Sequence, residues 1–124
     1  MPHMQVRSPV TASPADLAKF LKVLKDADIN ILCAGGGDIE HGGEFAFGVE
    51  DGVEVAATQA LEAEGYHPRV VGVDHDYLDD RPGALHDFVA KVARQNTASN
   101  KKIKDVCCGV ANAQGKYLVQ IYSE

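Results

Sequence analysis

The sequence lacks a long apolar run, a signal-peptide-like leader and a paired cysteine motif. Without about 20 consecutive apolar residues no helix can span a bilayer, so we expect no membrane partner. The first residues contain no apolar stretch of signal-peptide length, which favours a cytoplasmic protein. The three cysteines are an odd number without C-x-x-C spacing. We interpret them as small buried side chains rather than as a disulfide, redox or metal site.

Positive charge is also scarce, because 12 Lys and Arg residues stand against 18 Asp and Glu residues in a chain of 124. The resulting net charge of −6 disfavours binding to a phosphate backbone, so we expect no nucleic-acid partner. The hydrophobic share of 45% and the charged share of 24% are typical of a globular protein. We therefore predict a single domain over residues 1–124.

Signatures of catalysis and of cofactor binding are missing as well. The run Gly35-Gly36-Gly37-Asp38 is followed by neither a helix nor a Lys-Ser or Lys-Thr pair, so we interpret it as part of a hairpin connection and not as a phosphate loop. The histidines are scattered without metal-ligand spacing, and no nucleophile elbow is present. We predict no cofactor, no bound metal and no catalytic residue.

The patterns that are present predict nine elements in the order β-α-β-β-α-β-α-β-β. Helix starts are indicated by Ser13-Pro14 and by Pro82, and apolar residues follow each start at helical spacing. Alternation and turn signals predict the strands. The predicted strands cover residues 4–10, 29–33, 45–49, 70–78, 103–110 and 117–122, and the predicted helices cover 13–28, 53–64 and 82–94, with a polar loop at 95–100.

An internal repeat is the most informative feature of the chain. A shift of 68 residues superposes two helix starts together with their apolar stripes. The matching pairs are Pro14 with Pro82, Leu17 with Leu85, Phe20 with Phe88, Leu21 with Val89, and Leu24 with Val92. Each copy has a strand before this helix and a hairpin after it. We therefore predict two repeats, at about 3–78 and 70–124, that share the strand near 70–78.

Connection rules turn this order into an α+β, ferredoxin-like fold. A right-handed β-α-β crossover and paired hairpin strands give the first four strands the order 2-3-1-4. Sharing of the fourth strand extends this to one six-stranded, antiparallel-type sheet of order 2-3-1-4-6-5, with three helices on one face. The other face would carry Leu118, Gln120, Tyr122, Val70 and Gly72. That face is too apolar to stay wet, so we expect a homodimer packed through it or through the sheet edges.

The second repeat carries a local motif. The strand Val71-Gly72-Val73-Asp74-His75-Asp76 precedes the turn Asp80-Arg81-Pro82-Gly83-Ala84-Leu85, which is followed by a helix and a hairpin. This arrangement resembles the ACT domain, a small regulatory module that binds amino acids. The resemblance covers the whole chain as two copies, of which the second lacks its last helix and strand. It implies a regulatory protein that senses an amino acid or similar metabolite and acts through a partner enzyme or its oligomeric state. The first copy departs from the motif, because no Gly follows Pro14.

The chemistry of the turn is consistent with ligand binding. Gly83 has no Cβ and lets a ligand approach the backbone, and the N–H groups at a helix start attract a carboxylate. Asp79 or Asp80 could pair with a ligand ammonium; alternatively, Asp80 only caps the helix. The predicted ligand-binding residues are Asp79, Asp80, Arg81, Pro82, Gly83, Ala84 and Leu85.

Two other functions stay open at this point. A small enzyme could use Asp74, Asp76 and His86, because ferredoxin-like sheets host many activities. On a strand, however, Asp74 and Asp76 share one face and His75 takes the other, so these three cannot form one relay. The chain could also be a purely structural dimerisation subunit.

Overall fold

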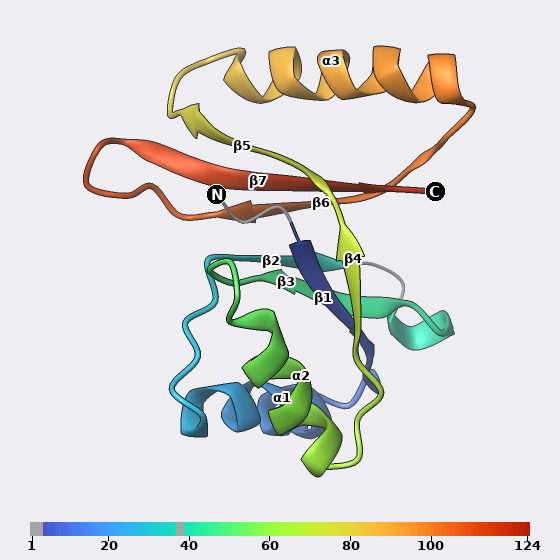
Figure 1. Cartoon of the computed structure of the whole chain (residues 1–124), viewed down its shortest axis with the longest axis vertical. Coiled ribbons are helices and arrows are strands. Elements are labelled where there is room, and N and C mark those ends of the chain that lie inside the picture. Colours follow the sequence, from blue (N-terminus) through green and yellow to red (C-terminus); the bar gives the residue numbers. More distant parts are fainter. Residues whose placement is uncertain (1–3, 37–38) are drawn as a thin grey trace.

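The computed structural model describes residues 4–36 and 39–124, which form three α-helices and seven strands (Figure 1). Gly37, Asp38 and His3 lie outside the described residues. None of the described helices is long and apolar enough to cross a membrane. In chain order the elements are β1 Met4–Pro9, α1 Pro14–Asp26, β2 Cys33–Gly36, a short 3-10 helix Ile39–His41, β3 Glu44–Gly48, α2 Glu54–Ala63, β4 Arg69–Gly72, β5 Asp74–Asp79, α3 Ala84–Ser99, β6 Ile103–Gly109 and β7 Lys116–Ser123.

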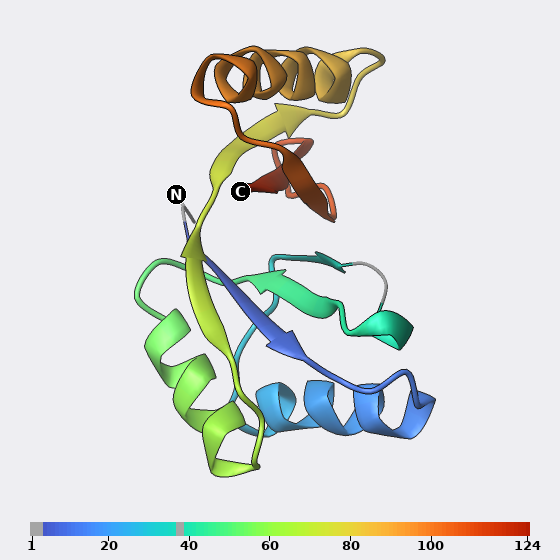
Figure 2. The ribbon, with the colours of Figure 1, turned by 90° about the vertical axis from the view of Figure 1, so that its right-hand side faces the viewer.

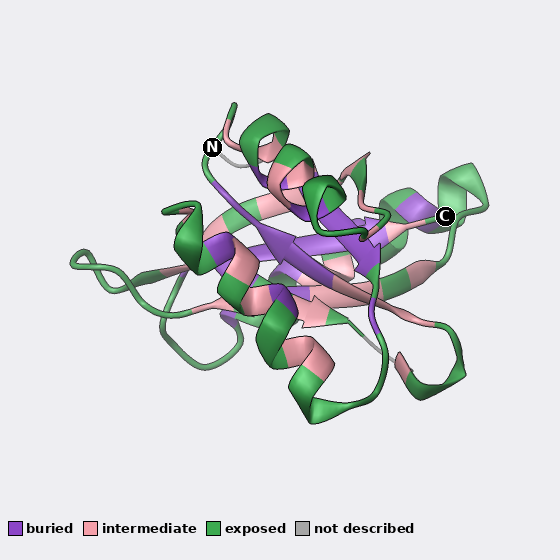
Figure 3. Cartoon of the chain, turned by 90° about the horizontal axis from the view of Figure 1, so that it is seen from below, coloured by how far each residue is buried: buried purple, intermediate pink, exposed green. Residues whose placement is uncertain are grey.

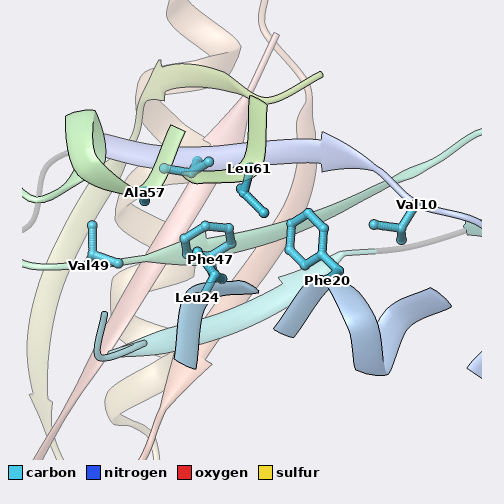
Figure 4. Close-up of a cluster of buried hydrophobic side chains, with 8 residues drawn as sticks. Val10, Phe20, Leu24, Phe47, Val49, Ala57 and Leu61 are labelled. Atoms are coloured by element: carbon cyan, nitrogen blue, oxygen red, sulfur yellow. The ribbon is translucent and has the colours of Figure 1, made fainter. Parts of the chain in front are cut away.

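The N-terminal half, residues 4–72, packs α1 and α2 against four strands in the order β4-β1-β3-β2. Figure 4 shows its core, in which Phe20 and Leu24 of α1 meet Phe47 of β3. The Phe20 ring stands edge-on to Phe47 and to Tyr66, at centroid distances of 6.1 and 4.9 Å. The apolar stripe predicted for the first helix is therefore confirmed as its core face.

The C-terminal half, residues 74–124, packs α3 against β5, β7 and β6. Its core is smaller and is formed by Leu78, Ala84, Phe88, Val92, Val119 and Ile121. The helix is longer than predicted, because it runs to Ser99 through the segment expected to be a polar loop. Asn96 explains the difference. Its side chain is buried, and its Nδ2 donates to Ser123 Oγ of β7 at 2.8 Å. This polar residue therefore packs on the sheet and extends the helix.

The two halves are joined into one sheet by antiparallel pairing of β2 with β6, where Ala34 lies opposite Cys108. The full order is β4-β1-β3-β2-β6-β7-β5. Residues that lie opposite each other on paired strands point to the same face of the sheet. Successive pairs therefore place on one face Phe47, Ala34, Cys108 and Val119. Phe47 packs under α1 and α2, and Val119 packs under α3. All three helices therefore lie on one face of the sheet.

The sheet curls so strongly that its other face closes on itself, and we call this face the inner face. Figure 2 shows β5, β6 and β7 turned over the strands of the N-terminal half, with the helices outside. The amide Nε2 of Gln5 on β1 lies 3.3 Å from Oε1 of Gln120 on β7 and 3.2 Å from Sγ of Cys107 on β6. Figure 3 shows the same arrangement as buried strands between helices whose outer surfaces are exposed.

Ion pairs close one end of the inner face. The guanidinium of Arg7 on β1 donates to Asp105 on β6 and to Glu44 on β3, and it lies 4.3 Å from the centroid of the Tyr122 ring. Arg69 also donates to Glu44, at 2.7 and 3.0 Å. Hydrogen bonds from Arg69 and then from Arg7 hold the pKa of Glu44 below its usual value.

The predicted sheet of six strands in the order 2-3-1-4-6-5 is wrong. The segment 70–78 is not one strand between two neighbours: β4 pairs with β1, and β5 pairs with β7, at opposite edges of a seven-stranded sheet. Period-two alternation shows which face a side chain occupies but not which neighbour its backbone pairs with, so the pattern could not reveal the break at Val73.

The predicted need for a second copy on the open face is also corrected. Leu118, Gln120 and Tyr122 are buried by the N-terminal half of the same chain, which supplies the cover that a dimer was expected to supply. A homodimer packed through the sheet edges, β4 and β5, stays a prediction. Two smaller differences are that β2 begins at Cys33 rather than at Ile29, and that α3 begins at Ala84 rather than at Pro82.

Candidate functional site

The turn between β5 and α3 has a backbone that only glycine adopts easily. The N–H of Asp80, directly after β5, donates to the carbonyl of Gly115 at 3.1 Å. Gly83 is the N-cap residue of α3 and has φ +87°, a left-handed conformation that costs an L side chain roughly 1–2 kcal/mol. A Cβ at Gly83 would meet no atom within 4 Å. The space above Gly83 is therefore open, as close approach of a ligand requires.

The start of α3 offers fewer free amides than the sequence suggests. The N–H of Ala84 donates to the carbonyl of Arg81 at 3.3 Å, so it is used within the turn. The amides of Gly83 and Leu85 have no backbone acceptor in the part of the chain that the structure describes. The alternative role of Asp80 as helix cap is wrong, because Gly83 occupies the N-cap position and no side chain caps the helix there.

A groove of about 310 Å³ lies between the turn, β5 and the first turns of α3. It brings together Asp79, Arg81 and Ala84 of the seven predicted residues. Its lining does not include Asp80, Pro82, Gly83 or Leu85, which are exposed around the turn.

The groove presents both signs of charge. Arg81 and Lys91 line it together with Asp76, Asp79 and Asp87. The hydrogen bond from Lys116 holds the pKa of Asp79 below its usual value, and Arg81 lies 3.9 Å from Asp87. Exposed pairs of this kind are worth little to stability, roughly 0–1 kcal/mol, so the charges can re-pair with a ligand at small cost. The groove can therefore receive a small zwitterion.

Sequence reasoning missed Asp87, Phe88 and Lys91, the part of α3 that lines this groove beyond Ala84. Ala84, Phe88 and Lys91 line it, and their spacing of 0, 4 and 7 places them on one face of the helix. That spacing was available in the sequence. The helical spacing identified Phe88 as a core residue, but it did not show that Phe88 and Lys91 also line the groove beside the turn.

The corresponding turn of the N-terminal half is filled by the chain itself. The carboxylate of Asp16 accepts the N–H of Thr11 at 2.8 Å and the hydroxyl of Tyr66 at 3.1 Å. The hydrogen bond from Thr11, followed by that from Tyr66, holds the pKa of Asp16 below its usual value. The acid of this turn thus already has its donors within the chain.

The residues of the enzyme alternative are not brought into one cleft. Asp74 lines a groove with Lys101, Asp76 lines the groove beside the turn, and neither cleft is lined by His86. The exposed His86 ring instead has Nδ1 at 3.2 Å from its neighbour Asp87. Among residues 4–36 and 39–124, no group of three or more His, Cys, Asp or Glu side chains could hold a metal ion.

The cysteines divide into two classes. Cys33 and Cys107 are buried on the inner face, and burial raises the pKa of each thiol to about 12. Cys108 points to the opposite face and is exposed. The prediction of buried cysteines is therefore right for two of the three positions.

The sequence matches no protein-family model and no curated protein. Solved structures, in contrast, share its fold over nearly all its length. Protein BT0572 from Bacteroides thetaiotaomicron is 22% identical with a TM-score of 0.70, and the match covers 100% of this chain and 81% of that one. The regulatory subunit of aspartate kinase from Thermus flavus is 17% identical with a TM-score of 0.65, covering 98% and 83%. That from Thermus thermophilus, in ligand-free form, is 18% identical with a TM-score of 0.64, covering 98% and 83%.

These neighbours are ACT-domain proteins, so the resemblance drawn from the turn and its flanking elements is confirmed at the level of the fold.

Proposed function

We propose that this chain is a regulatory protein that binds an amino acid or similar small metabolite and has no active site of its own. Its fold is that of solved regulatory subunits of aspartate kinase, and this likeness supports a regulatory, small-molecule-binding role. The observation that carries the proposal is the groove beside the turn, which offers both signs of charge next to an unobstructed glycine.

The ligand in this proposal is held by groups that match a zwitterion. Its carboxylate approaches the amides of Gly83 and Leu85 and the guanidinium of Arg81, because a helix start and a cation both favour an anion. Its ammonium approaches Asp79 or Asp80. Pro82 and Ala84 complete the set, as the residues that shape the start of the helix.

The regulatory effect would pass to a partner enzyme in the cytoplasm or through the oligomeric state. In this proposal the chain is one domain of two ACT-like repeats, 3–78 and 70–124, that meet at the segment linking β4 and β5. A homodimer would form through the sheet edges, because the inner face is already covered. Ligand sites at the turn of each copy would then be equivalent by symmetry.

A thermal-melt screen against the twenty amino acids tests the proposal. A ligand at 100 times its dissociation constant stabilises the folded chain by about 2.7 kcal/mol. We expect at least one amino acid to raise the melting temperature. If none does, the amino-acid-sensing role is wrong and the purely structural alternative is favoured.

The variant Gly83→Val then tests whether the ligand binds beside this turn, and Gly65→Val is its matched control. Both glycines have a positive φ, +87° and +88°, and neither would bring a Cβ within 4 Å of another atom. Each variant should therefore lose a similar roughly 1–2 kcal/mol of stability from backbone strain. Only Gly83→Val should also lose the ligand-induced shift. Equal shifts in the two variants would place the ligand elsewhere.

A further inference from the structure

A second cleft, of about 360 Å³, opens on the other side of β5 from the groove beside the turn. It lies at the end of the inner face, where loops from both halves meet. Residues 30–32 and Glu50 contribute from the N-terminal half, and residues 110–112 contribute from the C-terminal half. Tyr77 and Leu118, which pair across β5 and β7, line it between these loops. We call it the inter-half cleft.

The walls of the inter-half cleft combine apolar and polar side chains. Ile31, Leu32 and Leu118 line it, and Leu118 belongs to the buried cluster of the inner face. Val110, at its border, is 87% exposed, more than any other large apolar side chain among the described residues. The volume falls in the range of small-molecule sites, and an apolar ligand group would cover a side chain that is otherwise in water.

The polar groups of the inter-half cleft are acidic or neutral. Its lining includes Glu50, Tyr77 and two asparagines, but no Lys, Arg or His. The side chains of Glu50 and Tyr77 make no hydrogen bond or ion pair with any residue that the structure describes. Burial, together with the negative charges of Glu50 and Asp51, raises the pKa of Tyr77. Glu50 is therefore the one charged residue in the described lining, and its charge is negative.

We propose that the inter-half cleft binds a small primary amine with an aliphatic chain of about the size of a leucine side chain. The ammonium pairs with the carboxylate of Glu50 and donates to the hydroxyl of Tyr77, and the hydrocarbon chain lies along Leu32 and Val110. An amino acid fits less well, because its carboxylate would lie beside Glu50 with no cation to meet it. The site is independent of the proposed amino-acid site, which lies on the opposite side of β5 and includes Arg81.

Three ligands that share a 3-methylbutyl chain separate these cases. The first is 3-methylbutan-1-amine, which is leucine without its carboxylate; the second is leucine; the third is 4-methylpentanoate, which is leucine without its amine. Each is titrated into ¹⁵N-labelled full-length protein and followed by the backbone amide resonances. We expect the amine to give saturable shifts at residues 30–32, 50–51 and 110–112. Leucine and 4-methylpentanoate should leave these resonances in place.

Glu50→Gln tests the charge, with Glu62→Gln on the exposed face of α2 as its control. Glu50→Gln should weaken amine binding roughly two- to five-fold, as expected for a partly exposed ion pair, and Glu62→Gln should leave it unchanged. Gly83→Val should also leave amine binding unchanged, even if it abolishes amino-acid binding. Equal binding of 4-methylpentanoate, unaltered affinity in Glu50→Gln, or no saturable shift at millimolar amine would each overturn the proposal.

Discussion

Arg7 provides a test of how the two halves are held together. Its guanidinium on β1 donates to both carboxylate oxygens of Asp105 on β6, at 3.1 and 2.5 Å, and to Glu44 at 3.1 Å. The side chains of Arg7 and Asp105 are only 7% and 13% exposed. They come from strands far apart in the sheet order, so they meet only because the sheet curls. A loss of this pair should therefore weaken the closure of the inner face.

The expected magnitude follows from the burial of the pair. Removing one member of a buried ion pair costs about 3–5 kcal/mol, because the other charge stays buried without its partner. The Asp105 side chain is 13% exposed and retains some contact with water, so Arg7→Met should fall at the low end, about 3 kcal/mol. Asp105→Leu should cost less, because Arg7 keeps Glu44 as an ion-pair partner. Replacing both by apolar side chains removes the orphaned charge, since Glu44 keeps Arg69 as its partner. The double variant should therefore lose no more than Arg7→Met alone, since both lose the hydrogen bond from Arg7 to the buried Gln5.

Urea unfolding of the four proteins at neutral pH measures this directly. The slope of free energy against urea should stay the same in all four, so that differences in midpoint report differences in stability. A double variant that loses the sum of the two single losses would show that Arg7 and Asp105 are not coupled. Single losses below about 1 kcal/mol would show that the pair behaves as an exposed ion pair, and that the inner face is open to water.

Two further predictions concern titration. Because the folded-state pKa of Glu44 lies below its ordinary value of 4.5, its ion pairs stabilise the protein above about pH 4.5 and are lost as pH falls through the lowered value. Glu44→Gln should therefore flatten the acid end of a stability-against-pH curve, and an unchanged acid slope would contradict this. Native protein at neutral pH should react with dithionitrobenzoate at Cys108 alone, because Cys33 and Cys107 are buried with a pKa of about 12, whereas urea should expose all three. Three fast thiols in the native state would mean that the inner face opens readily.

The sequence predicted those parts of the fold that depend on one face of one element. Phe20 and Leu24 at helical spacing, and Phe47 on an alternating strand, are core residues as expected. The turn before α3 was also found, because Gly83 and its neighbours carry a local motif. Such signals arise from contacts within or directly beneath an element, and a single sequence contains them.

The closure of the sheet could not be predicted in this way. Gln5 and Gln120 are buried polar residues that meet across the inner face, although glutamine in a strand usually indicates a surface position. Leu118 was recognised as a residue that needs cover, but its cover was assigned to a second chain. Whether an apolar strand face packs on the same chain or on another depends on pairing between distant strands, and no local pattern encodes that choice.

The candidate site was predicted in part for the same reason. Asp79, Arg81 and Ala84 lie next to one another in sequence and line the groove, whereas Lys91 enters it from two turns further along α3. The inter-half cleft was not anticipated at all, because its walls come from both halves and Glu50 stands at a turn without any motif. A site assembled by the curl of the sheet can be found only once the curl is known.

The curl itself follows from the connection between β4 and β5. These two strands lie at opposite edges of a seven-stranded sheet, and only Val73 separates them in the chain. In a flat sheet, six spacings of about 4.8 Å would hold the edges roughly 29 Å apart. The two steps from Gly72 through Val73 to Asp74 span at most about 7 Å. The sheet must therefore bend until its edges almost meet. With the helices on the outside, such bending presses the inner face together and buries Gln5 against Gln120. The break at Val73 is thus what turns an extended sheet into a closed one, with clefts where its loops converge.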